Sequence, residues 1–113
     1  IADWISSVRV DAFTGATPLA LQKFEGIQTD TLNLLGFCHY KLGAHERAIA
    51  CFEKLIALDP SSAIDYANIA SNYRAMGKKS EAVQYYQLAL SLDAGIDFAR
   101  EHLLQLGVDP DAA

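Results

Sequence analysis

The sequence predicts an all-α fold, an α-solenoid in which antiparallel helical hairpins stack side by side. One observation is that a block of the chain recurs at a fixed period, and another is that apolar residues within each copy follow helical spacing. The composition agrees, because 113 residues that are 51% hydrophobic and 20% charged are typical of a folded domain with one continuous core.

The repeat becomes visible when the sequence is aligned with itself so that residues 32–59 stand opposite residues 66–93, which needs no insertion. The identical and similar pairs include Gly43/Gly77, Ala48/Ala82, Asp59/Asp93, Leu35/Ile69, Gly36/Ala70 and Phe52/Tyr86. A fixed period of this length indicates stacked repeats.

Each copy contains two helical patterns separated by a glycine. In the first copy we expect one helix over residues 32–42, a break at Gly43, and a second helix that ends at Asp59-Pro60. The inward-facing residues of these two helices are expected to include Leu32, Leu34, Leu35, Cys38, Leu42, Ala48, Ile49, Phe52, Leu55 and Ile56. Gly36 and Ala48 leave room for two backbones to approach, and Phe52 fills the space beside them.

The second copy repeats this arrangement. Ser62 and Asp65 have the spacing of a capping box, so a helix is expected to begin there. Gly77 makes the turn, and the core positions of the two helices are Tyr66, Ile69, Ala70, Tyr73, Ala82, Val83, Tyr86, Ala89 and Leu90.

These residues resemble the tetratricopeptide repeat, whose pattern is W-x2-L-G-x2-Y, then A-x3-F, then P. The first unit reads Leu32-x2-Leu35-Gly36-x2-His39, Ala48-x3-Phe52 and Pro60. The second reads Tyr66-x2-Ile69-Ala70-x2-Tyr73 and Ala82-x3-Tyr86, with Ala94 in place of proline. The resemblance implies a right-handed superhelix of hairpins with a C-terminal capping helix.

The predicted boundaries are residues 29–62 and 63–96 for the two repeats, 97–108 for the capping helix and 109–113 for a frayed tail. In the capping helix, Phe98, Leu103 and Leu106 are the expected inner residues. Residues 1–28 form either a degenerate repeat or a helical cap that is not a repeat. Trp4, Gly15, Ala20 and Phe24 have the family's spacing, but Ser7, Val8 and Asp11 do not fit it. Thr17-Pro18 is a sound helix start in either case.

Both cysteines and two of the three histidines lie between residues 38 and 51. None of them has the C-x2-4-C or H-x3-5-H spacing of a zinc site, so we expect no metal and no cofactor. We expect Cys38 to be a small core residue, although a disulfide to Cys51 across the hairpin is conceivable. Because the chain also lacks a nucleophile elbow, an H-E-x-x-H motif and a phosphate-binding loop, we do not expect an enzyme.

The resemblance also implies that the first helix of each hairpin lines a concave groove that holds a peptide or a partner helix. Here the predicted groove residues are Asn33, Phe37, Tyr40, Lys41, Asn68, Ser71 and Arg74, and the last helix could add Phe98, Glu101, His102 and Gln105. Phe37 either belongs to this groove or packs against residues 1–28. Of the residues that grip a C-terminal carboxylate in cochaperone members, only Asn68 has a match here.

Two functions of different class follow. The chain is a module that binds a protein or peptide, or it is a structural piece that forms a homodimer or packs against other parts of a longer protein. A net charge of −5 argues against nucleic-acid binding, and no apolar run reaches the roughly 18–20 residues that insertion into a membrane requires. Because the chain starts at Ile1 and has few cysteines, we expect a fragment of a longer cytoplasmic protein.

Overall fold

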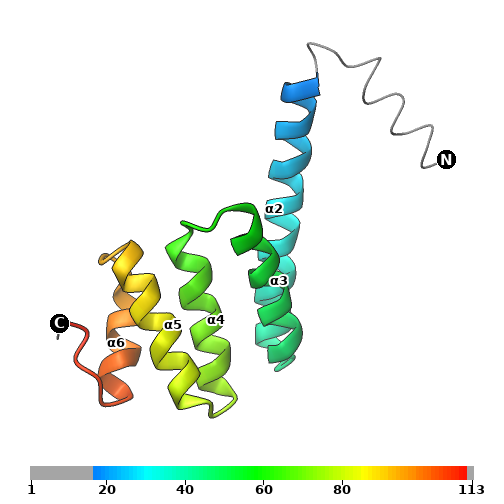
Figure 1. The fold of residues 1–113 in the computed structure, drawn as a ribbon. Helices are drawn as coiled ribbons and strands as arrows, with labels where there is room; N and C mark the ends of the chain where they lie inside the picture. The colour runs from blue at the N-terminus through cyan, green and yellow to red at the C-terminus, as the bar shows by residue number, and fades with distance from the viewer. Residues whose placement is uncertain (1–16, 112–113) are drawn as a thin grey trace. The chain divides into compact units, whose positions relative to one another are not determined.

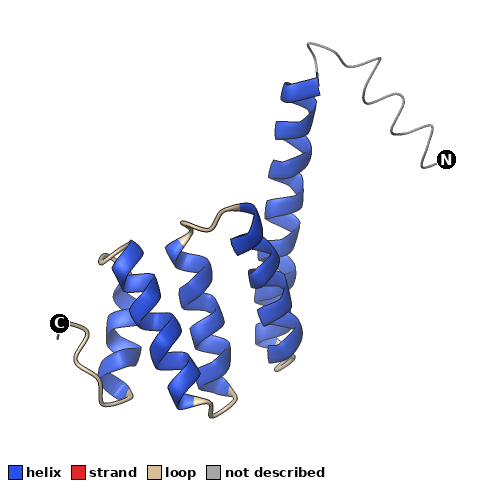
Figure 2. Cartoon of the chain, in the orientation of Figure 1, coloured by secondary structure: helices blue, strands red, loops and turns tan. Residues whose placement is uncertain are grey.

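The computed structural model describes residues 17–111, which form five helices and no strand (Figures 1 and 2). The helices are α2 (Thr17–Lys41), α3 (His45–Leu58), α4 (Ala63–Ala75), α5 (Lys79–Leu92) and α6 (Asp97–Gln105). The predictions for Trp4, Ser7, Val8, Asp11 and Gly15, and for the side chains of Ala20 and Phe24, lie outside what is described. The chain divides into two units between Thr31 and Leu32, and the packing below is that of residues 32–111.

The helix boundaries reproduce the sequence period. α3 begins at His45 and ends at Leu58, and α5 begins and ends exactly one period later in the alignment, at Lys79 and Leu92. α4 and α6 likewise begin at equivalent positions, Ala63 and Asp97. The prediction of an all-α fold of repeated hairpins is therefore confirmed.

Glycine makes the turn between the two helices of each hairpin, as predicted. Gly43 and Gly77 have φ angles of 78° and 77°, in the left-handed region that other residues rarely adopt. At the first turn, the N–H groups of Gly43 and Ala44 donate to the carbonyls of Tyr40 and His39. This double hydrogen bond is the Schellman motif, which satisfies the last carbonyls of a helix.

α2 is much longer than the predicted helix over residues 32–42, since it runs without a break from Thr17. Thr17 is the first residue that the structure describes and already lies in α2, so the predicted start at Thr17-Pro18 stays a prediction, and α2 passes through the boundary expected between residues 28 and 29. The physical reason is the absence of a helix-breaking residue, because the only proline between Thr17 and Lys41 is Pro18, which lies near the N-terminal end of this segment, where proline is tolerated. Gly26 is the one weak position in this stretch, and a glycine in a helix costs only about 1 kcal/mol.

The first hydrophobic core lies between α2, α3 and α4. Its buried members are Leu32, Ala48, Ile49, Phe52, Leu55 and Ile69. Phe52 is its largest side chain, and its ring packs against Gly36 of α2. Ile69 belongs to the second repeat, so this core also joins the two repeats.

The second core lies between α4, α5 and α6, which are packed successively against one another (Figure 1). Tyr86 takes the place that Phe52 has in the first core, and it is fully buried. Its surroundings are mostly alanine, at positions 67, 70, 82, 89 and 99, all with no exposed surface. Small residues therefore allow the helices to approach closely, and one large ring fills the remaining space. Leu103 of α6 completes this core, as predicted, with Phe98 and Leu106 half-buried.

Four apolar residues that were predicted to face inward are exposed instead: Leu34, Leu35 and Cys38 of α2, and Leu42 in the turn after it. On α4, the equivalents of Leu35 and Cys38 are Ile69 and Asn72, which are buried on the side that faces α3. Within residues 32–111 no helix lies in the equivalent position beside α2. The sequence pattern marked these residues correctly as one helix face but could not show what covers it.

The predicted capping box at the start of α4 is wrong in its hydrogen bonds. Ser62 is the residue that precedes α4, but its hydroxyl makes no capping bond to the backbone. It donates instead to Oδ2 of Asp65, at 2.6 Å. Asp65 is buried and its Oδ1 has no partner among the described residues, so burial raises the pKa of this carboxyl.

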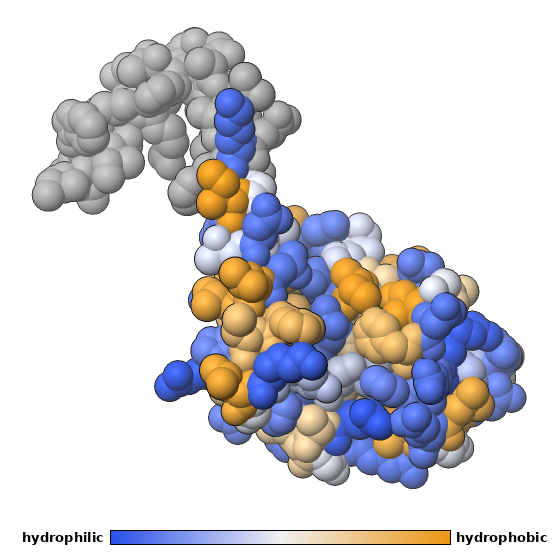
Figure 3. Space-filling model, turned by 180° about the vertical axis from the view of Figure 1, so that it is seen from behind, coloured by the Kyte–Doolittle hydropathy of each residue, from blue (hydrophilic) through white to orange (hydrophobic). Residues whose placement is uncertain are grey.

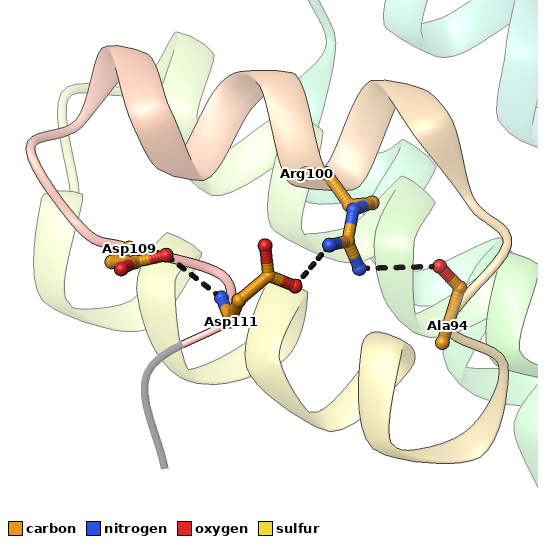
Figure 4. A network of polar contacts seen from close by, with 4 residues as sticks. All are labelled: Ala94, Arg100, Asp109 and Asp111. Atoms are coloured by element: carbon orange, nitrogen blue, oxygen red, sulfur yellow. Dashed lines mark hydrogen bonds and ion pairs between the residues drawn. The ribbon is translucent and has the colours of Figure 1, made fainter.

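The C-terminal residues turn back onto α6 rather than fraying at residue 109. Asp111 pairs with Arg100, which also donates to the carbonyl oxygen of Ala94, and the Asp111 N–H donates to Asp109 (Figure 4). This ion pair is exposed and contributes little stability, about 0–1 kcal/mol. Across residues 17–111, none of the helices combines the length and the hydropathy that a membrane span needs.

Candidate functional site

A cavity of about 180 Å³ opens among side chains from four helices. It is lined by Phe37 and Tyr40 of α2, Phe52 of α3, Asn68, Ser71 and Asn72 of α4, and Phe98 and His102 of α6. Five of these eight residues are aromatic or imidazole rings, so the walls are largely apolar. Concave apolar sites with a few polar groups are the usual form of a binding pocket.

Helical spacing explains why these residues meet. Asn68, Ser71 and Asn72 are three and four residues apart, so α4 presents them on one face. Phe98 and His102 are four residues apart on α6, and their ring centroids lie 5.8 Å from one another. The periodic stacking of the hairpins then places the faces of successive first helices next to each other.

A chain of three polar groups lies behind the cavity wall. The hydroxyl of Tyr86 lies 2.7 Å from Oγ of Ser71 and 2.6 Å from Nδ1 of His102. When the imidazole is neutral at Nδ1, Tyr86 donates to it and accepts from Ser71. The three residues come from α5, α4 and α6, so this chain joins all the helices of the second core.

Burial changes the proton affinity of two of these groups. It raises the pKa of the Tyr86 hydroxyl, which the hydrogen bond from Ser71 partly offsets. It also lowers the pKa of His102, and the positive charge of Arg74 lowers it further. His102 is therefore neutral at pH 7, and it presents an aromatic, uncharged ring to the cavity.

The two asparagines of α4 differ in their bonding. Asn72 is buried, its Nδ2 donates to the carbonyl oxygen of Asn68 at 2.8 Å, and its Oδ1 lies 2.9 Å from Nδ1 of His45. This second contact joins the start of α3 to α4. The side-chain amide of Asn68, by contrast, makes no hydrogen bond within residues 17–111, so its donors and acceptor are open to a ligand.

Two positively charged side chains, Lys41 and Arg74, lie near the cavity. The ammonium of Lys41 lies 5.3 Å from the ring centroid of Phe37 and 5.9 Å from that of Tyr40, within cation–π range. Arg74 donates to the neutral amide of Gln105, at 2.7 Å. In the described part of the chain, neither forms an ion pair with a carboxylate.

The structure brings together four of the seven predicted groove residues, Phe37, Tyr40, Asn68 and Ser71, around one cavity. Lys41 stacks on two of its rings, Arg74 is held by Gln105, and Asn33 is exposed and does not line it. Phe98 and His102, expected as additions from the last helix, do line it.

Two lining residues, Phe52 and Asn72, were not among the predicted groove residues. Phe52 was assigned to the core only, but its ring, which packs against Gly36, also lines the cavity. The sequence did contain a signal for Asn72, because the second repeat has a polar amide at the position where the first repeat has Cys38.

The cysteines and histidines do not assemble into a metal site in the described residues, where no three potential ligands lie together. Cys38 and Cys51 are free thiols. The expected core position of Cys38 is wrong, because Cys38 lies on the exposed face of α2 described above.

The fold and the cavity define a helical-repeat protein with a ligand-sized hollow on the face of its first helices. The family model of the tetratricopeptide repeat matches residues 28–94, and the chain belongs to that family. Over 64 residues it is 32% identical to a probable UDP-N-acetylglucosamine–peptide N-acetylglucosaminyltransferase SEC of Arabidopsis thaliana. That match covers 57% of this chain but 7% of the relative, so the chain corresponds to a small part of that protein.

Tetratricopeptide repeats generally mediate protein–protein interaction and are themselves non-catalytic. The family therefore supports a protein-binding role in general terms. It gives neither the partner nor the surface that the partner contacts.

Proposed function

We propose that this chain binds a peptide or a helix of a partner protein in the groove formed by α2, α4 and α6. The observation that carries the proposal is the 180 Å³ cavity, whose aromatic walls come from separate helices and whose lining includes Asn68, a residue whose side-chain amide has no hydrogen bond among the described residues. The rings would take up an apolar side chain of the partner, and Asn68 would hydrogen-bond its backbone.

The size of the cavity suits one bulky side chain. A cavity of about 150 Å³ lined by apolar residues holds a benzene ring, so leucine, methionine or phenylalanine would fit here. Burying such a side chain contributes about 1.5–3 kcal/mol, which makes it an anchor of the kind that dominates peptide recognition.

The charges favour a partner with an acidic residue beside the anchor. Lys41 and Arg74 lie near the cavity without an ion-pair partner among the described residues, although the chain as a whole is acidic. A carboxylate next to the apolar anchor would meet them, which would add an electrostatic component to recognition.

A larger hollow of about 600 Å³ lies between α5, Arg100 and the C-terminal residues. Its lining includes Gln87, Ser91, Arg100, Asp109 and Asp111, and the Arg100–Asp111 pair belongs to it (Figure 4). Because it lacks aromatic walls, it is the weaker candidate despite its volume.

We further propose that the chain has no catalytic activity and needs no cofactor. The transferase activity named for the Arabidopsis relative belongs to a protein of which this chain matches only a small part. A cytoplasmic location stays a prediction of the sequence.

Selection from a random peptide library displayed on phage tests the groove. Peptides enriched on the wild-type chain are expected to share one large apolar residue and to bind at least tenfold more weakly to Phe98→Ala and to Asn68→Ala. Leu92→Ala is the matched control, because Leu92 is exposed on α5 and does not line the cavity. Enriched peptides that bind all three variants as well as the wild type would disprove the groove proposal.

A further inference from the structure

Exposed apolar area does not by itself identify a regulated site in this molecule. The face drawn in Figure 3 carries several apolar patches among hydrophilic residues, and such patches are common on protein surfaces. The groove cavity differs, because one of the rings in its wall can gain a charge. Among the described residues that line it there is no Asp, Glu, Lys or Arg, and His102 is the only histidine. Histidine is the side chain whose ordinary pKa allows a change of charge near neutral pH.

The hydrogen bonds behind His102 depend on its protonation state. With a neutral ring, the Tyr86 hydroxyl donates to Nδ1 across 2.6 Å and accepts from Ser71 across 2.7 Å. A protonated imidazole carries hydrogen on both nitrogens, so Nδ1 must donate to the Tyr86 oxygen, and Tyr86 must turn its own hydrogen toward Ser71. The hydroxyl hydrogen of Ser71 then needs a new acceptor. Protonation of His102 therefore reverses two hydrogen bonds in the wall of the cavity.

The groups around the ring also act on its protonation. Burial lowers the pKa of His102 below its ordinary value of 6.5, Arg74 of α4 lowers it further, and Glu101 of α6 opposes both. From α5 the ring meets the hydroxyl of Tyr86, and α2 contributes the ammonium of Lys41, which lies over an aromatic ring of the cavity wall. These surroundings favour the neutral ring at pH 7, so acid is needed to charge it.

We propose that the groove holds an apolar anchor of its partner while His102 is neutral and releases that anchor when His102 binds a proton. The inference rests on the groove function proposed above and adds its regulation. An apolar side chain seated beside the ring removes water, and water is what solvates an imidazolium, so the anchor and the proton compete. By linkage, a proton weakens anchor binding by the same factor by which the anchor weakens proton binding.

Affinity measured by isothermal titration calorimetry between pH 7.5 and pH 5 tests this competition. The probe is a peptide from the phage selection with blocked ends and with every Asp, Glu and His replaced by Asn or Gln, so that only the protein titrates. The wild-type chain is expected to bind it at least about threefold more weakly at pH 5 than at pH 7.5. His102→Gln, which cannot titrate, should lose much less affinity between the two pH values.

His45→Gln is the matched control. His45 bonds to Asn72 but does not itself line the cavity, so this variant should lose as much affinity in acid as the wild type does. Circular dichroism at each pH verifies that the helices remain.

Nuclear magnetic resonance of the imidazole supplies the reciprocal measurement. The pKa of His102, followed through its ring resonances, should be lower in the peptide complex than in the free chain. A higher pKa in the complex, an affinity that does not change with pH, or an equal change in His102→Gln overturns the proposal. Failure of the wild type to bind any selected peptide at pH 7.5 would refute the groove function itself, so the two proposals fail in different measurements.

Discussion

The ring of Phe52 packs directly against Gly36, so closely that a Cβ atom at residue 36 would lie 2.8 Å from Cζ of the phenylalanine. Phe52 is buried, and its ring also lines the cavity. Any side chain at residue 36 would therefore displace a residue that belongs both to the first core and to the candidate site.

Gly36→Ala should destabilise the domain for this reason. Alanine favours a helix over glycine by about 1 kcal/mol, but the displaced ring costs about 1–3 kcal/mol, so the expected net loss is at most about 2 kcal/mol. Gly26→Ala is the matched control, because a Cβ there meets nothing within 4 Å and only the helix preference remains. Urea unfolding of both variants measures the difference, and equal stability of the two would contradict the close packing.

Removing the buried hydroxyl of Tyr86 tests the polar chain behind the cavity. Tyr86→Phe leaves Ser71 and His102 without their shared partner in a buried place, which should cost about 1–3 kcal/mol in the free energy of unfolding. Tyr85→Phe is the control, since Tyr85 stacks on Tyr66 and Tyr73 and its hydroxyl makes no hydrogen bond in residues 17–111. Equal stability of Tyr86→Phe and Tyr85→Phe would show that the polar chain contributes nothing net.

These contacts also show how much of the fold could be predicted from the sequence. The repeat period predicted where the helices of both hairpins end, because packing faces must recur in step for hairpins to stack. It predicted Phe52 and Tyr86 as core residues, since each follows an alanine by four positions at the same place in its repeat.

The sequence could not show which faces remain open. Leu35 and Ile69 are equivalent in the period, but Ile69 is buried and Leu35 is 44% exposed, because burial depends on a neighbouring helix. Nor could it show that the hydroxyl of Ser62 bonds to the Asp65 carboxylate, since a capping box and this contact have the same residue spacing. Among the cavity residues, Phe52 was missed because it was assigned to the core alone, and Asn72 was missed although it shares one face of α4 with Asn68 and Ser71.

The lowered pKa of His102 makes stability depend on pH near neutrality. Burial of the ring, together with the charge of Arg74, holds the folded-state pKa below its ordinary value of 6.5. Between those two values the unfolded chain binds more protons, so stability is complete above about pH 6.5 and falls as pH drops toward the folded-state pKa.

Urea titrations at about pH 7.5 and pH 5.5 measure this loss. His102→Gln keeps an acceptor for the Tyr86 hydroxyl but cannot titrate, so its stability should change less between the two values than that of the wild type. An equal change in both proteins would assign the pH dependence to other groups.

Asp65 should give the opposite dependence in acid. Burial raises its pKa above the ordinary value of 3.8, and the charge of Asp59 adds to this, while the hydrogen bond from Ser62 opposes it. The folded state then holds the proton more tightly, so the stability from this group is complete below pH 3.8 and is lost as pH rises through the folded-state pKa.

Asp65→Asn removes this dependence, so its stability relative to the wild type should rise between about pH 3.5 and pH 6. Asp59→Asn is a control with the reverse sign. The hydrogen bonds from Ser61 lower the pKa of Asp59, so its contribution is present above pH 3.8 and is lost as pH falls through the lowered value. Thermal or urea unfolding across this range distinguishes the two, because the stability difference from the wild type should rise with pH for Asp65→Asn and fall for Asp59→Asn. If both stability differences moved in the same direction with pH, the inference that burial raises the pKa of Asp65 would be wrong.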